Sequence, residues 1–204
     1  MLDKIRKSIK DYEPKKFGSR TKSAVLLPLI EINDELHILY EVRSQAVSQA
    51  GDSSFPGGRV EEGESFEEAA VRETMEELNL KRENIEVFGE IDYIVNQHMI
   101  IRCFVGELIG VDVSKIKPNL EVEQIYTIPL SYLIENEPSY FEVGFDPVFE
   151  EQFLKELEKE RKEYNLSNIK EVIPYYQIDT HSLWGFTANL TERFVEIIRQ
   201  DISI

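Results

Sequence analysis

The chain has 204 residues, of which 39 are acidic and 23 basic, so its formal net charge is −16 at pH 7. This acidic balance excludes duplex nucleic acid and anionic membrane surfaces as expected partners, because both attract basic patches. The length suffices to bury the core of one domain without disulfides or a structural metal, and we expect a single domain over residues 1–204.

The first part of the chain is expected to form a short helix followed by two strands. Residues 1–12 carry apolar side chains at helical spacing, and we regard residues 1–20 as an N-terminal helical extension. The apolar, partly β-branched runs 23–30 and 36–42 predict strands. The polar stretch 43–54 predicts a loop.

Residues 65–78 predict a helix whose start is well defined. Ser65 is suited to the N-cap position, and Glu68, three residues later, can complete a capping box. Apolar residues recur through the segment at helical spacing, which gives the helix one face for the core.

The second half of the chain mixes predicted strands and helices, which favours a layered α/β or α+β domain. We treat residues 146–204 as a C-terminal, largely helical elaboration of that domain. The predicted strands are 85–91, 100–108, 124–128 and 172–178; a short helix begins at Leu130, a charged amphipathic helix covers 149–164, and a closing helix covers 185–199.

The most informative stretch is GGRVEEGESFEEAAVRETMEELNL, residues 57–80. Glu73 and Glu77 lie four residues apart on the predicted helix, so their carboxylates rise on one face, and Glu76 lies close by. Like charges at this spacing destabilise an isolated helix, and oxygen ligands of this kind suit Mg²⁺ or Mn²⁺. The alternative is that these acids form an exposed, solvated helix face in an acidic protein.

The same stretch resembles the Nudix box, GX5EX7REUXEEXGU, where U is a bulky apolar residue. Thr74 occupies the first bulky position, and Asn79 replaces the last glycine, although asparagine also tolerates a left-handed helix end. The positions that match as they stand are Gly58, Glu64, Arg72, Glu73, Glu76, Glu77 and Leu80.

This resemblance implies an α/β/α sandwich with a mixed sheet and a metal-binding loop and helix. It also implies Mg²⁺- or Mn²⁺-dependent hydrolysis of a nucleoside diphosphate linked to another moiety, with Glu73, Glu76 and Glu77 as catalytic residues. Glu73 and Glu77 would bind the metal, together with the backbone carbonyl of Gly57. Glu76 would be a further ligand or would orient the attacking water.

Two further roles follow from the resemblance. Arg72 and Glu64 would form a structural ion pair that holds the glycine loop against the helix. The general base is a box glutamate or an acid on a distant loop, and the segment PNLEVEQIYTIPL, residues 118–130, resembles the family segment that carries such an acid. Glu121 takes the matching position in that segment, with Glu123 as the nearby alternative.

Two other segments resemble coenzyme A diphosphatases of this family. Residues 43–58, RSQAVSQAGDSSFPGG, are similar to the signature that precedes the box, but the loop is one residue shorter and lacks an arginine. Residues 181–198, HSLWGFTANLTERFVEII, are similar to the segment that opens the last helix, in which we expect Trp184 to be structural. The candidates for binding the 3′-phosphate of the substrate are Arg43, Arg59, Lys115 and Lys117.

We therefore expect an enzyme that cleaves coenzyme A (CoA) or its derivatives to 3′,5′-ADP and 4′-phosphopantetheine. The first alternative is a Nudix hydrolase of ADP-ribose or another nucleoside diphosphate derivative, which the shortened loop favours. The second is a non-catalytic nucleotide sensor, which would be expected to lack one or more box carboxylates.

The remaining expectations concern the setting of the protein. The longest strongly apolar run, 24–30, is too short to cross a membrane, and the first twenty residues contain no stretch suited to a secretory signal. The single cysteine, Cys103, favours a reducing compartment. We expect a cytoplasmic protein that binds a small-molecule substrate and neither nucleic acid nor membrane.

Overall fold

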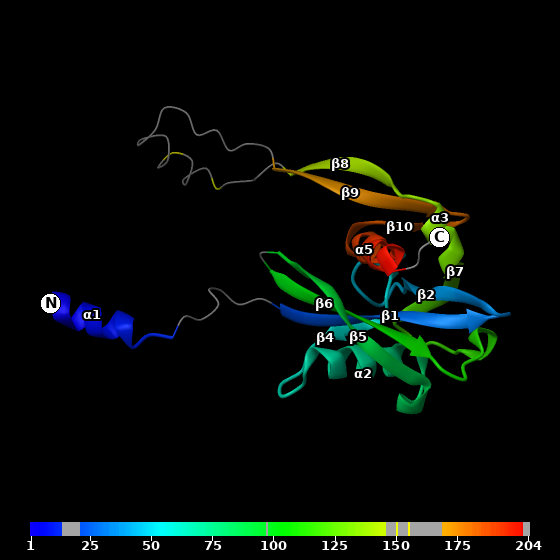
Figure 1. The fold of residues 1–204 in the computed structure, drawn as a ribbon, viewed down its shortest axis with the longest axis horizontal. Helices are drawn as coiled ribbons and strands as arrows, with labels where there is room; N and C mark the ends of the chain where they lie inside the picture. The colour runs from blue at the N-terminus through cyan, green and yellow to red at the C-terminus, as the bar shows by residue number, and fades with distance from the viewer. Residues whose placement is uncertain (14–20, 97, 146–149, 151–154, 156–168, 202–204) are drawn as a thin grey trace.

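The structure, a computed structural model, describes residues 1–13, 21–96, 98–145, 150, 155 and 169–201. Figure 1 shows the arrangement of its elements. In chain order they are α1 (Leu2–Lys10), β1 (Thr21–Ile32), β2 (Glu35–Arg43), β3 (Ser53–Ser54), β4 (Gly57–Arg59), α2 (Phe66–Leu78), η1 (Arg82–Asn84), β5 (Ile85–Val95), β6 (Met99–Leu108), η2 (Val113–Lys115), β7 (Val122–Pro129), α3 (Leu130–Glu135), β8 (Ser139–Phe145), β9 (Ile169–Ile178), β10 (His181–Leu183) and α5 (Gly185–Asp201).

Most of the predicted elements are present, and several short strands are additional. The predicted helices at the start, centre and end of the chain correspond to α1, α2 and α5, and the long predicted strands correspond to β1, β2, β5, β6, β7 and β9. The sequence did not predict β3, β4, β8 or β10, because two or three residues, or a run interrupted by glycine and acid, give little periodicity. The predicted helix 149–164 lies outside the described residues, apart from Glu150 and Lys155.

The main sheet is mixed, as expected. Its strand order is β3-β2-β1-β6-β5; β1 and β6 are parallel, whereas β1–β2 and β5–β6 are antiparallel. Two further strands join the sheet off this path, β4 beside β1 and β7 beside β2. β1 therefore lies centrally in the sheet.

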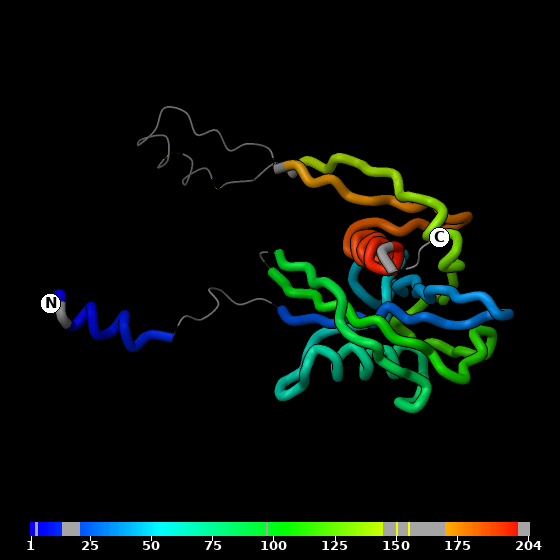
Figure 2. The backbone as a smooth tube through the Cα atoms, in the orientation of Figure 1, coloured from blue at the N-terminus to red at the C-terminus, as the bar shows by residue number. Residues whose placement is uncertain are grey.

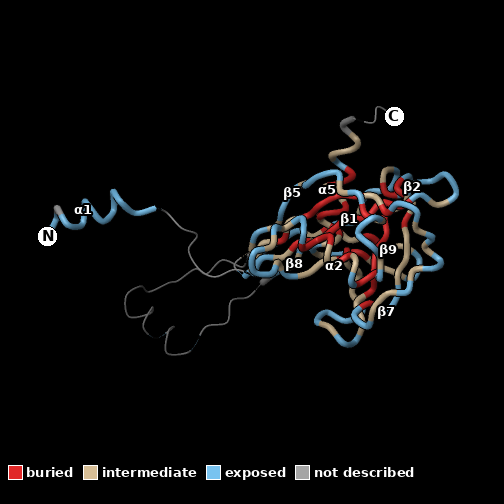
Figure 3. Tube along the Cα trace, turned by 90° about the horizontal axis from the view of Figure 1, so that it is seen from below, coloured by how far each residue is buried: buried red, intermediate tan, exposed pale blue. Residues whose placement is uncertain are grey.

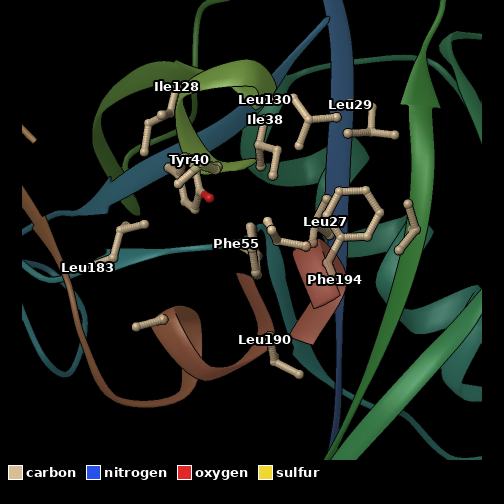
Figure 4. Close-up of a cluster of buried hydrophobic side chains, with 14 of the residues drawn as sticks. Leu27, Leu29, Ile38, Tyr40, Phe55, Ile128, Leu130, Leu183, Leu190 and Phe194 are labelled. Atoms are coloured by element: carbon tan, nitrogen blue, oxygen red, sulfur yellow. The ribbon is translucent and has the colours of Figure 1, made fainter. Parts of the chain in front are cut away.

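Two apolar clusters hold helices against opposite faces of this sheet. Because side chains alternate along a strand, Leu26 and Ile30 of β1 pack on the α2 side, while Leu27 and Leu29 pack on the α5 side. Figure 4 shows the second cluster, in which Leu27 meets side chains of α5 such as Phe194. The two covered faces confirm the predicted α/β/α sandwich.

A second sheet lies beyond α5. Its strand order is β10-β9-β8, and both pairings are antiparallel. In Figure 2 the β8–β9 hairpin passes over α5 on the side away from the main sheet. Tyr176 of β9 and Leu183 of β10 are buried in the same cluster as Leu27, so the C-terminal segment contains a small sheet as well as a helix.

Burial is concentrated in the main sheet and the two helices that cover it. Figure 3 shows these buried segments together, whereas α1 is exposed along its length. The apolar side chains of α1 that share its helical stripe, Leu2, Ile5 and Ile9, are all exposed. Cys103 on β6 is fully buried. None of the described helices combines the length and apolar character needed to cross a membrane.

Candidate active site

The candidate site lies where β2 and β4 separate along one edge of β1. β2 pairs with β1 only over residues 29–32 of β1, whereas β4 pairs with residues 23–25. Beyond this fork β2 continues between β3 and β7. The segment between β3 and β4 spans the fork and is tied to β1 by the N–H of Leu26, which donates to the carbonyl of Pro56 at 2.9 Å.

Helix α2 packs beneath this fork and has a fixed start and end. The Ser65 hydroxyl accepts from the Glu68 N–H, and the Glu68 carboxylate accepts from the Ser65 N–H, which completes the predicted capping box. At the other end Asn79 adopts the left-handed conformation (φ 50°), as expected for a residue in the place of glycine. These caps fix the length of α2 and hence the position of its acids.

Glu77 is buried, with only 4% of its surface exposed, although the sequence suggested an acid on the helix surface. Its Oε2 accepts a hydrogen bond from the N–H of Gly57 at 2.8 Å. Burial and the nearby charge of Glu41 raise the pKa of the Glu77 carboxyl well above its ordinary value, and the Gly57 bond only partly opposes them. The ionised form of Glu77 is therefore unfavourable in this environment without a cation.

Glu73 and Gly58 are in close contact. A Cβ at position 58 would lie 2.3 Å from Oε1 of Glu73, which is a steric clash. Glycine at this position therefore allows the Glu73 carboxylate to lie against the backbone of the loop. The same Oε1 lies 3.0 Å from Nη1 of Arg72. Partial burial raises the pKa of Glu73, and the hydrogen bond and charge of Arg72 oppose this effect. The helix thus presents one buried and one partly buried carboxylate to the glycine loop.

Arg72 joins the loop to the helix. Its Nε donates to Oε1 of Glu64 at 2.9 Å, and its Nη2 donates to Oε2 of Glu64 at 3.2 Å and to the carbonyl of Arg59 at 2.9 Å. A planar guanidinium suits this two-oxygen contact. Glu64 and Arg72 therefore lie together as the resemblance implied.

Glu41 on β2 is a site residue that the sequence analysis missed. It is 1% exposed, and its Oε1 accepts from the Ser54 hydroxyl at 3.0 Å. Burial raises the pKa of its carboxyl above the ordinary value, despite the Ser54 bond and the charge of Arg43. The signal was available, because an acid inside the apolar run 36–42 is out of place on a two-sided buried strand.

The other predicted acids are exposed and differ in how close they lie to the buried carboxylates. Glu121 is exposed, but its charge adds to the effect of burial in raising the pKa of both Glu41 and Glu73, so it lies near them. Glu76 is exposed, with Oε2 3.4 Å from Nη1 of Arg72. Glu123 is also exposed.

The predicted cations differ in position. Arg43 is close to the acids, because its charge opposes the raised pKa that burial gives to both Glu41 and Glu77. Arg59 is exposed at the end of β4. Lys115 pairs instead with Asp112 at 2.9 Å.

The oxygen ligands near the fork suit a divalent cation in their chemistry, although they are not gathered around a single point in the structure. Among the described residues, no three carboxylate, imidazole or thiolate groups are gathered closely enough to hold one ion. Oε2 of Glu41, however, is buried and has no hydrogen-bond partner in the described part of the chain. Clustered carboxylates that offer only oxygen atoms, one of them buried and unpartnered, suit Mg²⁺ or Mn²⁺.

A cavity of about 410 Å³ adjoins the site. Its lining includes Arg43, Ser54 and Gly57 together with the aromatic residues Trp184 and Phe186. Trp184 is 46% exposed, so the expected structural role is not supported by burial. The remaining lining residues come mainly from the β8–β9 hairpin and the start of α5, among them Val143, Ile173, Thr187 and Leu190.

Comparison with known proteins gives the chain a family. Residues 21–140 match the family model described as the NUDIX domain. Nudix hydrolase 3 of Caenorhabditis elegans is 31% identical over 119 residues, covering 55% of this chain and 49% of that protein. The human protein named mitochondrial coenzyme A diphosphatase NUDT8 is 26% identical over 183 residues, covering 86% of this chain and 69% of that protein.

A solved structure extends the similarity over almost the whole chain. The crystal structure of a MutT/nudix family protein from Enterococcus faecalis aligns with a TM-score of 0.50 and 14% identity. The alignment covers 97% of this chain and 70% of that one, and it shows similarity of fold alone. The match to the C. elegans protein spans about half of that protein's length.

The two adjacent glycines are expected to respond differently to alanine. A Cβ at Gly57 would lie 2.4 Å from the carbonyl oxygen of Ala24, a backbone atom, so Gly57→Ala is expected to lower the free energy of unfolding by at least about 2 kcal/mol. Gly58→Ala needs only the Glu73 side chain to move, so it should fold and bind Mn²⁺ more weakly. Chemical denaturation and Mn²⁺ titration measure both effects. Gly89→Ala, which meets nothing within 4 Å, is the control; equal stability of the Gly57 and Gly89 variants would contradict the packing described.

The contacts of Arg72 predict a loss of stability when they are removed. Arg72→Ala deletes the bonds to Glu64 and to the Arg59 carbonyl, and we expect the free energy of unfolding to fall by about 1–3 kcal/mol. Urea denaturation measures it, with Lys81→Ala, which removes an exposed ion pair, as the matched control. An Arg72 variant as stable as the Lys81 variant would show that the pair does not hold the loop.

Proposed function

Because the chain belongs to the NUDIX family, we propose that it is a metal-dependent hydrolase that cleaves the diphosphate bond of coenzyme A or its derivatives. The observation that carries the proposal is the pair of box carboxylates, Glu73 and Glu77, held against Gly57 and Gly58 beside a cavity. The expected products are 3′,5′-ADP and 4′-phosphopantetheine.

Glu73, Glu77 and the carbonyl of Gly57 are the groups that would hold Mg²⁺ or Mn²⁺. The cation supplies positive charge against the diphosphate and lowers the pKa of the attacking water. In an acidic protein the buried carboxylates repel a polyanionic substrate, so binding of the substrate depends on their neutralisation.

We assign the role of general base, which accepts the proton of the attacking water, to one of the remaining acids. Glu121 is exposed yet electrostatically close to Glu41 and Glu73, so its carboxylate can reach solvent-derived water at the edge of the site. Glu76 is the alternative acceptor on α2. Arg43, which lies near the acids and lines the cavity, is assigned to a substrate phosphate. Arg59 would act only at the periphery, since it is exposed and does not line that cavity.

The cavity favours a long substrate over a compact one. The cavity lining combines Arg43 with the apolar side chains of Trp184, Phe186 and Ile173, and such apolar surface suits an adenine ring or the pantetheine arm of CoA. The human relative is named as a coenzyme A diphosphatase, in agreement with this choice. The loop 43–54, shortened relative to the signature, favours ADP-ribose instead, so both substrates are compared below.

We further propose that residues 1–204 act as one domain. Tyr176, Leu183 and Phe194 of the C-terminal elements share an apolar cluster with Leu27 of the central strand, so the second sheet and α5 complete the core and the cavity wall. The cytoplasmic location and the absence of a nucleic-acid partner stay predictions from composition.

The box assignment predicts a loss of activity without a loss of folding in Glu77→Gln. The amide keeps an acceptor for the Gly57 N–H but removes the charge, so kcat with Mg²⁺ is expected to fall at least about tenfold, or about 1.4 kcal/mol. Without metal the melting temperature should rise, because glutamine avoids the cost of burying a carboxyl whose pKa burial has raised. Steady-state kinetics and thermal unfolding measure these changes, with the exposed Glu67→Gln on the same helix as the control. Retention of more than a tenth of kcat would remove Glu77 from the metal ligands.

The substrate assignment predicts that CoA is hydrolysed with a higher kcat/KM than dephospho-CoA or ADP-ribose. A 3′-phosphate bound by a single cation is worth about 1 kcal/mol, or roughly fivefold. Initial rates on the three compounds at equal Mg²⁺, with products identified by mass, measure the preference. Preference for ADP-ribose by about tenfold or more would overturn the CoA assignment and leave a Nudix hydrolase of another nucleoside diphosphate derivative.

A further inference from the structure

We propose that Glu41, on β2 and outside the box, is a further ligand of the divalent cation bound by Glu73 and Glu77. This inference rests on the proposed metal-dependent function. It assigns a third protein carboxylate, contributed by the sheet and not by the helix, to the same ion.

The register of β2 directs Glu41 toward α2. Ile38 and Tyr40 belong to the cluster on the α5 side, and Leu39 belongs to the cluster on the α2 side. Since side chains alternate along a strand, Glu41 faces the same side as Leu39. It lies on the part of β2 that has left β1 and pairs with β3, where Glu41 is opposite Ser54. The fork between β2 and β4 therefore gives Glu41 access to the helix beneath.

The two carboxylate oxygens of Glu41 differ in their hydrogen bonding. Oε1 accepts from the Ser54 hydroxyl, which fixes the orientation of the carboxylate. Oε2 is buried and has no hydrogen-bond partner among the described residues. Burying an unpartnered carboxylate oxygen lowers the stability of the folded protein, because the oxygen loses its hydrogen bonds to water and forms no others. A cation at Oε2 would remove this deficit.

Charges from several elements act on Glu41, and their balance favours a cation. Glu77 and Glu73 on α2 and Glu121 before β7 bring negative charge toward it, while Arg43 on its own strand brings one positive charge. A purely structural role as the acceptor for Ser54 would need one oxygen and no charge. Glutamine or serine would fulfil that role at a lower cost in a buried position.

The experiment measures cation binding directly in the full chain. Mn²⁺ is titrated and free Mn²⁺ is counted by electron paramagnetic resonance, for the wild type, Glu41→Gln, Glu77→Gln and the exposed-strand control Glu31→Gln. We expect Glu41→Gln to weaken Mn²⁺ binding at least about tenfold, whereas Glu31→Gln stays within about twofold of the wild type. We also expect Glu41→Gln to raise the melting temperature without metal and to reduce the increase that Mn²⁺ produces.

A second measurement distinguishes direct coordination of the ion by Glu41 from an electrostatic effect of a nearby carboxylate. With Eu³⁺ as the probe, luminescence lifetimes in H₂O and D₂O count the water molecules on the ion. Glu41→Ala is expected to gain about one bound water because a lost protein oxygen is replaced by solvent. Glu31→Ala should gain none. An unchanged water count in Glu41→Ala would overturn the ligand assignment.

The outcomes distinguish this inference from the proposed function. If the wild type binds no Mn²⁺, the metal-dependent function and this inference both fail. If Glu77→Gln loses Mn²⁺ binding but Glu41→Gln retains wild-type affinity, only the inference about Glu41 fails. Should Glu41→Gln not fold, Glu41→Asp decides: it keeps the charge on a side chain one methylene shorter, so weakened Mn²⁺ binding supports the inference and wild-type affinity overturns it.

Discussion

Buried negative charge at the fork of the central sheet is the constraint on which the rest of the site depends. Glu41 and Glu77 approach from β2 and α2 and are almost completely removed from water. Their hydrogen bonds, from Ser54 and the N–H of Gly57, satisfy one oxygen of each and leave the charges close together. Folding therefore supplies an unfavourable pair of carboxylates that a divalent cation can stabilise, and an empty site of this kind lowers the stability of the protein.

The surrounding elements hold this pair in place. The caps of α2 fix its length, the Arg72–Glu64 contact fixes the loop, and the glycines at 57 and 58 let backbone and carboxylate approach closer than any Cβ would allow. On the opposite face, α5 and the β8–β9 hairpin add walls to a cavity that begins at the same loop. The groups proposed to bind the metal and the cavity proposed to select the substrate thus both adjoin the glycine segment between β3 and α2.

The helix α2 and its acids could be predicted from sequence because capping, helical spacing and the box pattern are local properties. The left-handed end at Asn79 could be predicted for the same reason. Glu41 could be singled out only as an acid inside an apolar run, because its contact with Ser54 and its place beside the box depend on how β2 leaves β1 and meets β3, which is a long-range pairing. The burial of Glu77 could not be predicted, because helical spacing identifies a shared face without showing that the glycine loop covers it. The position of Trp184, half-exposed at the cavity, could not be predicted either, since it depends on how the C-terminal sheet and α5 pack against the loop before β4.

The central claim is that the carboxylates at the fork exist to hold a divalent cation. The most direct measurement is an anomalous difference map from crystals of the full chain grown with Mn²⁺, recorded near the manganese absorption edge. We predict a manganese peak bounded by the carboxylates of Glu73 and Glu77 and the carbonyl of Gly57, with Glu41 on its sheet side. A site without manganese in crystals that bind it elsewhere, or a peak at the fork that none of these oxygens contacts, would contradict the account.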